Sequence, residues 1–184
     1  MDQVNKNAES KMKKAIAAMQ EDFQSIRTGR ASSALFEKIL VDYYGTKTPL
    51  KQMANISIPE ARLVVIQPFD RTALGEIEKA IQKSELSVNP NNDGKVIRIA
   101  IPPLTEDRRK ELVKLTKTKA ENARVSIRNI RRDANEELKK MQKNSEISED
   151  DSKRGIDEVQ KLTDKYIEEV NKLLEAKEAE ILEV

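Results

Sequence analysis

The chain has 184 residues, of which 36% are charged and 3% aromatic, and its formal net charge is +2. This balance favours long solvated helices over a β-sandwich or a barrel. Cysteine and histidine are both absent, which excludes a disulfide framework, a thiolate metal site and any catalytic site built on histidine. The composition therefore favours a binding protein over an enzyme.

The N-terminal segment has the pattern of an amphipathic helix, which we predict to run to about Thr28, where Gly29 breaks it. Its apolar stripe, with steps of three and four residues, comprises Ala8, Met12, Ala15, Met19, Phe23 and Ile26. No apolar run approaches the length of a signal peptide or a membrane span. We therefore expect a cytoplasmic protein with no membrane contact.

Between Leu35 and Ile101 the pattern changes to that of short strands. Asp70 is a candidate N-cap for a helix that reaches about Ser84. We expect a small β/α/β domain in which Leu74, Ile77 and Ile81 of that helix face inward. The strands are predicted at 39–43, 56–58, 63–67 and 96–101, and a turn is predicted at 89–94.

Two long helices are predicted in the C-terminal part of the chain. Thr105, which follows two prolines, and Ser148, which follows a polar segment, are candidate N-caps. The stripe of the first helix comprises Leu112, Ala120, Ala123, Ile127, Ile130, Ala134, Leu138 and Met141. The stripe of the second comprises Ile156, Val159, Leu162, Tyr166, Val170, Leu173 and Ile181.

Three amphipathic helices predict an α+β fold, in which an antiparallel three-helix bundle of residues 1–29 and 105–184 carries the β/α/β segment 30–104 as an insertion. An inserted domain has two linkers, and both linkers here contain residues that break regular structure. We expect a monomer made of two rigid bodies. The predicted hinge residues are Gly29, Arg30, Ala31, Ser32, Pro102, Pro103 and Leu104.

The two long C-terminal helices carry opposite charge. Residues 105–145 hold 13 Lys or Arg against 7 Asp or Glu, net +6, and residues 146–184 hold 6 against 13, net −7. One interpretation is that the helices attract each other across flanking positions of the bundle. That interpretation explains the sum of the charges but not their arrangement.

Four arginines share one flank of the first long helix, beside its apolar stripe: Arg124, Arg128, Arg131 and Arg132. Glu121 lies seven residues before Arg128 and is expected to be too far away for a regular ion pair, so we predict a locally under-neutralised patch. Arginine holds phosphate with two hydrogen bonds, which favours nucleic acid over a membrane. Because stacking aromatics are scarce, we expect folded RNA contacted through its backbone.

No catalytic or metal centre is predicted. The five glycines form no phosphate-binding loop, and acidic runs such as 149–151 are typical of helix caps. We therefore predict no cofactor, no metal and no enzyme activity. Two alternatives stay open. One is a coiled-coil adaptor that docks protein partners and would tolerate loss of the arginines, and the weaker one is an enzyme.

Several strings of this sequence, in this order, resemble the ribosome recycling factor family. They are R-T-G-R-A-S at 27–32, V-D-Y-Y-G-T at 41–46, P-P-L-T-E-D-R-R-K at 102–110, R-N-I-R-R-D-A-N at 128–135 and D-E-V-Q-K-L-T-D at 157–164. The resemblance covers nearly the whole chain. One departure is Ser33, which stands where many relatives carry proline.

The resemblance implies an L-shaped, hinged molecule similar in outline to a transfer RNA. It also implies a translation factor that binds the large ribosomal subunit after termination and splits the ribosome with elongation factor G, whose GTP hydrolysis supplies the energy. Arg27, Arg128, Arg131 and Arg132 match arginines that contact ribosomal RNA in the family. Ribosomal proteins near the subunit interface are further implied partners.

Overall fold

A computed structural model of the chain describes residues 1–183, which divide into two units. Unit 1 comprises residues 1–28 and 105–183, and unit 2 comprises Gly29–Leu104. The first boundary falls one residue before the end of the range 1–29 that the sequence predicts. Each unit has its own secondary structure and its own buried core.

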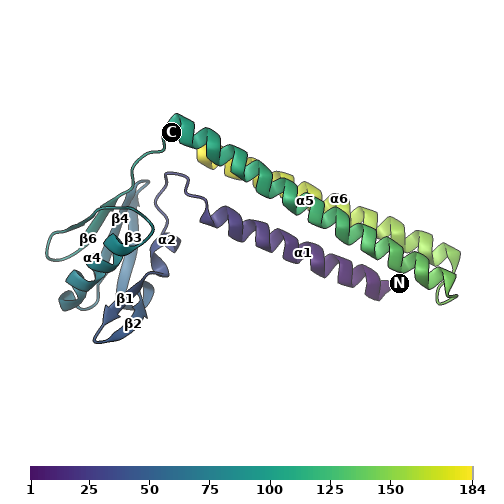
Figure 1. Cartoon of the computed structure of the whole chain (residues 1–184), viewed down its shortest axis with the longest axis horizontal. Coiled ribbons are helices and arrows are strands. Elements are labelled where there is room, and N and C mark those ends of the chain that lie inside the picture. Colours follow the sequence, from purple (N-terminus) through teal and green to yellow (C-terminus); the bar gives the residue numbers. More distant parts are fainter. Residues whose placement is uncertain (184) are drawn as a thin grey trace. The chain divides into compact units, whose positions relative to one another are not determined.

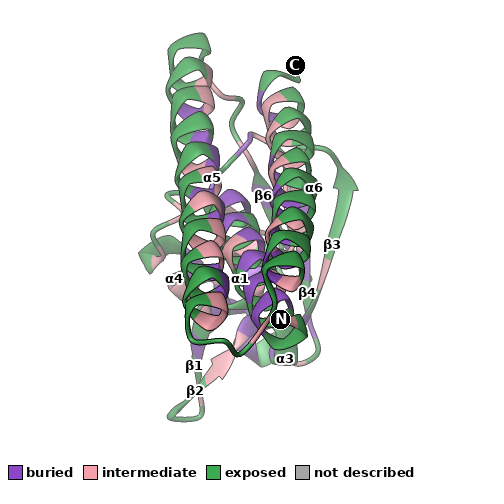
Figure 2. Cartoon of the chain, turned by 90° about the vertical axis from the view of Figure 1, so that its right-hand side faces the viewer, coloured by how far each residue is buried: buried purple, intermediate pink, exposed green. Residues whose placement is uncertain are grey.

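Unit 1 is a bundle of three long helices: α1 (Asp2–Ser25), α5 (Glu106–Lys143) and α6 (Glu149–Leu182). α1 and α6 run in the same direction and α5 runs against both, so a short turn joins α5 to α6 (Figure 1). The buried residues lie on the faces that the three helices turn toward one another, and the residues of the outer faces are exposed (Figure 2). The predicted three-helix bundle and the α+β fold class are confirmed.

The predicted starts of both long C-terminal helices are confirmed. The Thr105 hydroxyl accepts a hydrogen bond from the backbone N–H of Arg108 at 3.2 Å, and the Ser148 hydroxyl accepts one from Asp151 at 3.0 Å. Each cap satisfies a backbone donor that has no partner within its helix. The end predicted for the first helix is wrong, because α1 stops at Ser25.

The buried stripes differ from the predicted ones at several positions. Ile16 is buried where Ala15 was predicted, and Thr116 and Thr163 are buried although neither was assigned to the core. Each threonine hydroxyl donates to the carbonyl oxygen four residues earlier, at 2.7 and 2.8 Å, so burial leaves no unpaired hydroxyl. The predicted stripe members that are only half-buried are Ala15, Ile130, Met141, Ile156, Leu162 and Leu173.

Unit 2 contains six strands in two antiparallel sheets, a β1–β2 hairpin and a four-stranded sheet in the order β3-β4-β6-β5. The strands are β1 (Leu40–Tyr43), β2 (Thr46–Pro49), β3 (Ala54–Glu60), β4 (Leu63–Pro68), β5 (Pro90–Asn92) and β6 (Ile97–Ala100). The four predicted strands are present with shifted ends. The turn predicted at 89–94 is wrong in part, because β5 pairs with β6 at the edge of the sheet, where a proline is tolerated.

Four short helical segments complete unit 2: α2 (Ala34–Glu37), α3 (Leu50–Met53), η1 (Arg71–Ala73) and α4 (Leu74–Lys83). The Asp70 carboxylate caps η1 by accepting the Thr72 backbone N–H at 3.0 Å, as predicted. The α4 residues Leu74, Ile77 and Ile81 are buried with apolar residues of the four-stranded sheet. The predicted inward face of this helix is therefore confirmed.

The two linker segments touch each other inside unit 2. Gly29 has φ of +79°, and a Cβ built there would lie 3.2 Å from the Leu104 Cγ atom. The backbone N–H of Ala31 donates to the carbonyl oxygen of Ala61 at 2.7 Å, and that of Ile101 donates to Arg62 at 2.8 Å. Ala31 is thus tied to the β3–β4 turn, and the hinge itself stays a prediction.

Candidate nucleic-acid interface

The four arginines predicted to form a patch all lie on α5. At about 100° per residue, Arg124, Arg128, Arg131 and Arg132 occupy an arc of roughly 100° on the helix surface. The side chain of Arg124 is 19% exposed and that of Arg128 is 40% exposed. Arg131 is half-buried and Arg132 is exposed, so the arc begins at the edge of the core and ends in solvent.

The prediction that Glu121 stands too far from Arg128 is wrong. The Arg128 Nη1 atom lies 3.2 Å from Glu121 Oε1, and the Arg124 Nη1 atom lies 2.9 Å from Glu121 Oε2. Residues seven positions apart lie on the same face of a helix, about two turns from each other. The long Arg128 side chain reaches back along the helix over that distance. The hydrogen bonds from Arg124 and Arg128 hold the pKa of Glu121 below its usual value. One carboxylate is thus shared by two guanidiniums.

The other polar partners of the arginines are neutral and lie on α6. The Arg124 Nε atom donates to the Asn171 Oδ1 atom at 2.9 Å, and the Arg131 Nη1 atom donates to Gln160 Oε1 at 3.4 Å. These amides orient the guanidiniums without removing their charge. Within residues 1–183, Arg132 has no hydrogen bond or ion pair from its side chain. The patch therefore keeps most of its positive charge.

Lysines extend the same side of α5 in both directions, a feature that reasoning from the arginines alone missed. From Lys110 to Lys143 the helix is about 50 Å long, at about 1.5 Å per residue. Glu121 is the sole acidic residue within this sector over those turns of α5. We call this surface the α5 basic face; it comprises Lys110, Lys114, Lys117, Arg124, Arg128, Arg131, Arg132, Lys139 and Lys143.

Opposite charge on α6 does little to neutralise the α5 basic face. Among the described residues, a single ion pair joins the two helices, between Lys117 and Glu178 at 3.9 Å. The acidic residues of α6 instead pair within their own helix: Lys153 with Glu149, and Lys172 with Glu168. Attraction between the two helices therefore does not account for the segregation of charge along the chain.

Arg27 lies outside the α5 basic face, in the segment between α1 and Gly29. Its side chain is exposed.

In residues 1–183 no group of three acidic side chains is arranged to hold a metal ion. None of the helices described is long and apolar enough to span a membrane.

Comparison with known proteins places the chain in a family. The family model described as ribosome recycling factor matches residues 19–182. The chain belongs to the ribosome recycling factor family. This match confirms the resemblance seen in the sequence strings. Members of this family are translation factors and not enzymes.

Similar members of the family match over their full length. The chain is 66% identical to the ribosome-recycling factor of Treponema denticola, over 100% of this chain and 99% of that protein. It is 62% identical to the factor of Caldicellulosiruptor bescii, with 96% of each chain covered. These alignments include the α5 basic face and the whole of unit 2.

Solved structures of the family share the fold. A solution structure of the ribosome recycling factor superposes with a TM-score of 0.80 at 50% identity, covering 100% of this chain and 97% of that one. A second match, with a TM-score of 0.65 and 44% identity, covers 99% and 98% of the two chains. That structure is described as models of the T. thermophilus recycling factor and the E. coli elongation factor G bound to the E. coli post-termination complex.

Proposed function

We propose that this chain is a cytoplasmic ribosome recycling factor that holds the RNA of the large ribosomal subunit with its α5 basic face. Together with elongation factor G, it splits the ribosome after termination. The observation that carries the proposal is the α5 basic face itself, nine basic side chains with a single acidic one among them. The first candidate contacts are Arg124, Arg128, Arg131 and Arg132, with Arg27 as a further contact outside that face.

The chemistry of the face suits an RNA backbone. Phosphates are spaced along a strand, so a helix that repeats positive charge over about 50 Å can neutralise several of them at once. Arginine adds paired hydrogen bonds to a phosphate, which a lysine cannot supply in the same plane. Side chains on the solvent side of a regular helix can make these contacts without disturbing the core of unit 1.

Elongation factor G is the proposed partner in splitting, and its GTP hydrolysis supplies the energy. The support is a similar protein that is described with elongation factor G on the post-termination complex. In this proposal, unit 1 stays on the RNA as a monomer. Unit 2 moves about the hinge formed by Gly29–Ser32 and Pro102–Leu104 and acts near ribosomal proteins at the subunit interface.

Co-sedimentation with isolated ribosomal subunits tests the proposal. The chain should pellet with the large subunit and not with the small one, and added salt should release it because counterions compete for the phosphates. Equal retention on both subunits, or retention that salt leaves unchanged, would contradict an RNA contact made by charge. The adaptor alternative predicts that replacing Arg128 and Arg131 leaves retention unchanged.

A second assay separates the partner's chemistry from that of this chain. The purified chain incubated with GTP should release no phosphate above a blank. With ribosomes and elongation factor G, the same chain should accelerate the appearance of free subunits. Phosphate release by the chain alone would contradict its assignment as a binding factor.

A further inference from the structure

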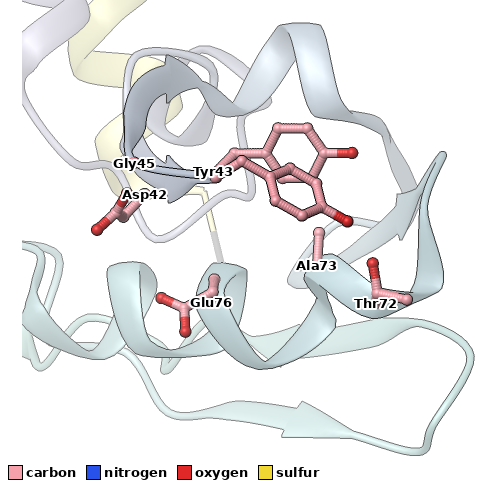
Figure 3. Close-up of a pocket in the computed structure, with 7 residues that line it drawn as sticks. Asp42, Tyr43, Gly45, Thr72, Ala73 and Glu76 are labelled. Carbon is pink, nitrogen blue, oxygen red and sulfur yellow. The ribbon is translucent and has the colours of Figure 1, made fainter.

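A pocket of about 400 Å³ lies between the β1–β2 hairpin and α4 of unit 2 (Figure 3). The Tyr43 ring lies at one end of this pocket and the carboxylates of Asp42 and Glu76 lie at the other, so its polar groups do not converge on one ligand. The Tyr43 hydroxyl already has a partner, because it donates to Asp70 at 2.9 Å. Enclosed polar atoms that lack a partner are found instead in unit 1, and one of them is on α5.

Asn135 of α5 is half-buried, and its Oδ1 atom is enclosed without a hydrogen-bond partner. Within residues 1–183, its Nδ2 atom makes no hydrogen bond either. An enclosed acceptor without a partner destabilises the folded chain, because it has lost its bond to water and gained none in exchange. Asparagine is also among the less favourable residues inside a helix, and α5 continues beyond it to Lys143. Neither core packing nor a helix cap therefore accounts for Asn135.

The position of Asn135 is inside the sector of the α5 basic face. At about 100° per residue, it lies about 20° from Arg128 and about 40° from Arg131 around the helix axis. Basic residues stand one turn before it and one turn after it, at Arg131 and Lys139. Asn135 is also the last residue of the string R-N-I-R-R-D-A-N at 128–135, of which the proposed RNA contact uses only the arginines. A neutral amide thus lies among cations that face the RNA in that proposal.

The chemistry of an amide selects among the groups of an RNA backbone. A phosphate only accepts hydrogen bonds, and a cation holds it more strongly than a neutral donor does. A ribose 2′-hydroxyl both donates and accepts, which matches the Oδ1 and Nδ2 atoms of an amide. Rotation about the χ2 angle, which is broad in asparagine, turns either atom of Asn135 toward a ligand. In double-stranded RNA the 2′-hydroxyls line a wide and shallow minor groove.

We propose that Asn135 contacts a ribose 2′-hydroxyl and so gives the α5 basic face a preference for RNA. The inference rests on the RNA contact proposed above, in which the arginines supply affinity through their charge. Charge alone does not distinguish RNA from DNA, because both carry phosphates along the backbone. The 2′-hydroxyl is the group that differs between them. Since the amide carries no charge, its contact adds affinity without releasing counterions.

The first test separates this contact from those of the arginines by measuring binding to the large subunit. Asn135→Ala should weaken binding about three- to tenfold, the range expected for one neutral hydrogen bond, and should leave the slope of log affinity against log salt unchanged. Arg131→Ala should instead flatten that slope by roughly 0.7 to 0.9. Asn135→Ala should also raise the urea concentration at which the chain unfolds, because it removes the unpaired acceptor and introduces a better helix former.

Two outcomes of this first test would overturn the proposal. One is a variant that binds the large subunit as tightly as the parent chain. The other is a variant that loses affinity and stability together, since that result would assign Asn135 a structural role. Asn129→Ala is the matched control on the same helix. Asn129 is exposed and lies about 120° around the helix axis from Asn135, so this variant should keep the parent's affinity.

The second test replaces the hydroxyl itself. The probes are an RNA duplex and the same duplex with 2′-fluoro riboses, which keeps the A-form geometry and the phosphates. Any RNA duplex serves, because the proposed contacts are all to backbone groups. The parent chain and Asn129→Ala should bind the RNA duplex about three- to tenfold more tightly than the 2′-fluoro duplex. Asn135→Ala should bind the two duplexes equally.

The 2′-hydroxyl contact and the proposed function fail separately in these measurements. Equal binding of the two duplexes by the parent chain, no binding of the RNA duplex, or an unchanged preference in Asn135→Ala would overturn the 2′-hydroxyl contact. None of these results touches binding to the large subunit. A parent chain that does not bind large subunits at any salt concentration would overturn the proposed function, and the inference with it.

Discussion

The two units carry their functional candidates on different kinds of backbone. In unit 1 the α5 basic face lies on a regular helix beside the residues that form the core, with six exposed and three half-buried side chains. In unit 2 the linker and the hairpin turn depend on left-handed backbone, at Gly29 and at Tyr44. Binding should therefore be separable from folding in unit 1, whereas in unit 2 a change at either position should also alter stability.

The largest expected effect comes from removing charge on α5. Arg128→Ala combined with Arg131→Ala should weaken binding to the large subunit by about tenfold, which corresponds to about 1.4 kcal/mol. If each arginine neutralises one phosphate, the slope of log affinity against log salt should fall by roughly 1.4 to 1.8. The free energy of unfolding should change by only about 0.5 kcal/mol per site, because truncation of these side chains leaves no cavity in the core.

The matched control for this pair lies on α6. Arg154→Ala with Lys172→Ala likewise removes two cations from the bundle, and both of these side chains are exposed and ion-paired within α6. It should leave the affinity and its salt slope close to those of the parent chain. An equal loss of affinity in both double variants would mean that net charge matters and the position of the charge does not.

Gly29→Ala should destabilise unit 2 by about 1 to 2 kcal/mol, since an alanine with positive φ is strained. The added Cβ would also press on Leu104, 3.2 Å away. Hydrogen exchange of the β4 and β6 amides reports the stability of this unit. Gly75→Ala is the control, because nothing lies within 4 Å of a Cβ there and helix propensity should raise stability by about 0.5 to 1 kcal/mol. Equal exchange rates in both variants would contradict the strain argument.

The stability of unit 1 should fall in alkaline solution through Tyr166. Burial, and then the hydrogen bond that its hydroxyl donates to Glu9, raise the pKa of Tyr166 to about 12. The folded bundle therefore favours the neutral phenol, and this contribution is complete below the unfolded pKa of about 10 and is lost as the pH rises towards 12. Urea unfolding of the parent and of Tyr166→Phe should give free energies that converge above pH 10. If the two free energies of unfolding changed in parallel with pH, the claim that folding raises the pKa of Tyr166 would be contradicted.

The smallest predicted effect is at the hairpin tip. Tyr44→Asn relieves a left-handed strain of about 1 kcal/mol, partly offset by loss of the contact with Tyr43. The net result should be a gain of about 0.5 kcal/mol in the free energy of unfolding of unit 2, measured by urea unfolding or hydrogen exchange. A loss of stability would show that Tyr44 supports the fold of unit 2.

Elements with a strong local signal could be predicted from the sequence. Thr105, Ser148 and Asp70 cap their helices as predicted, because a cap depends on a few neighbouring residues. β5 could not be recognised, because Pro90–Asn92 has the composition of a turn and becomes a strand only by pairing with β6. Thr116 and Thr163 were left out of the core because the bonds from their hydroxyls to the helix backbone cannot be seen in an apolar pattern.

For the candidate site, the positions of the arginines could be predicted from the sequence but their ion pairs could not. The spacing of the arginines was enough to place Arg124, Arg128, Arg131 and Arg132 on one side of α5. The shared ion pairs of Glu121 were missed, because they depend on how far two long side chains reach along the helix.

The most direct test of the central claim is a map of the RNA around α5. The chain has no cysteine, so a single introduced one can carry a tethered iron chelate that cleaves nearby RNA by hydroxyl radicals. Val125→Cys places the probe between Arg124 and Arg128 at a side chain that is 44% exposed. Lys161→Cys places it on α6, beside residues of α1. We predict strong cleavage of large-subunit RNA from the first position and little from the second, and cleavage from the second alone would contradict the α5 interface.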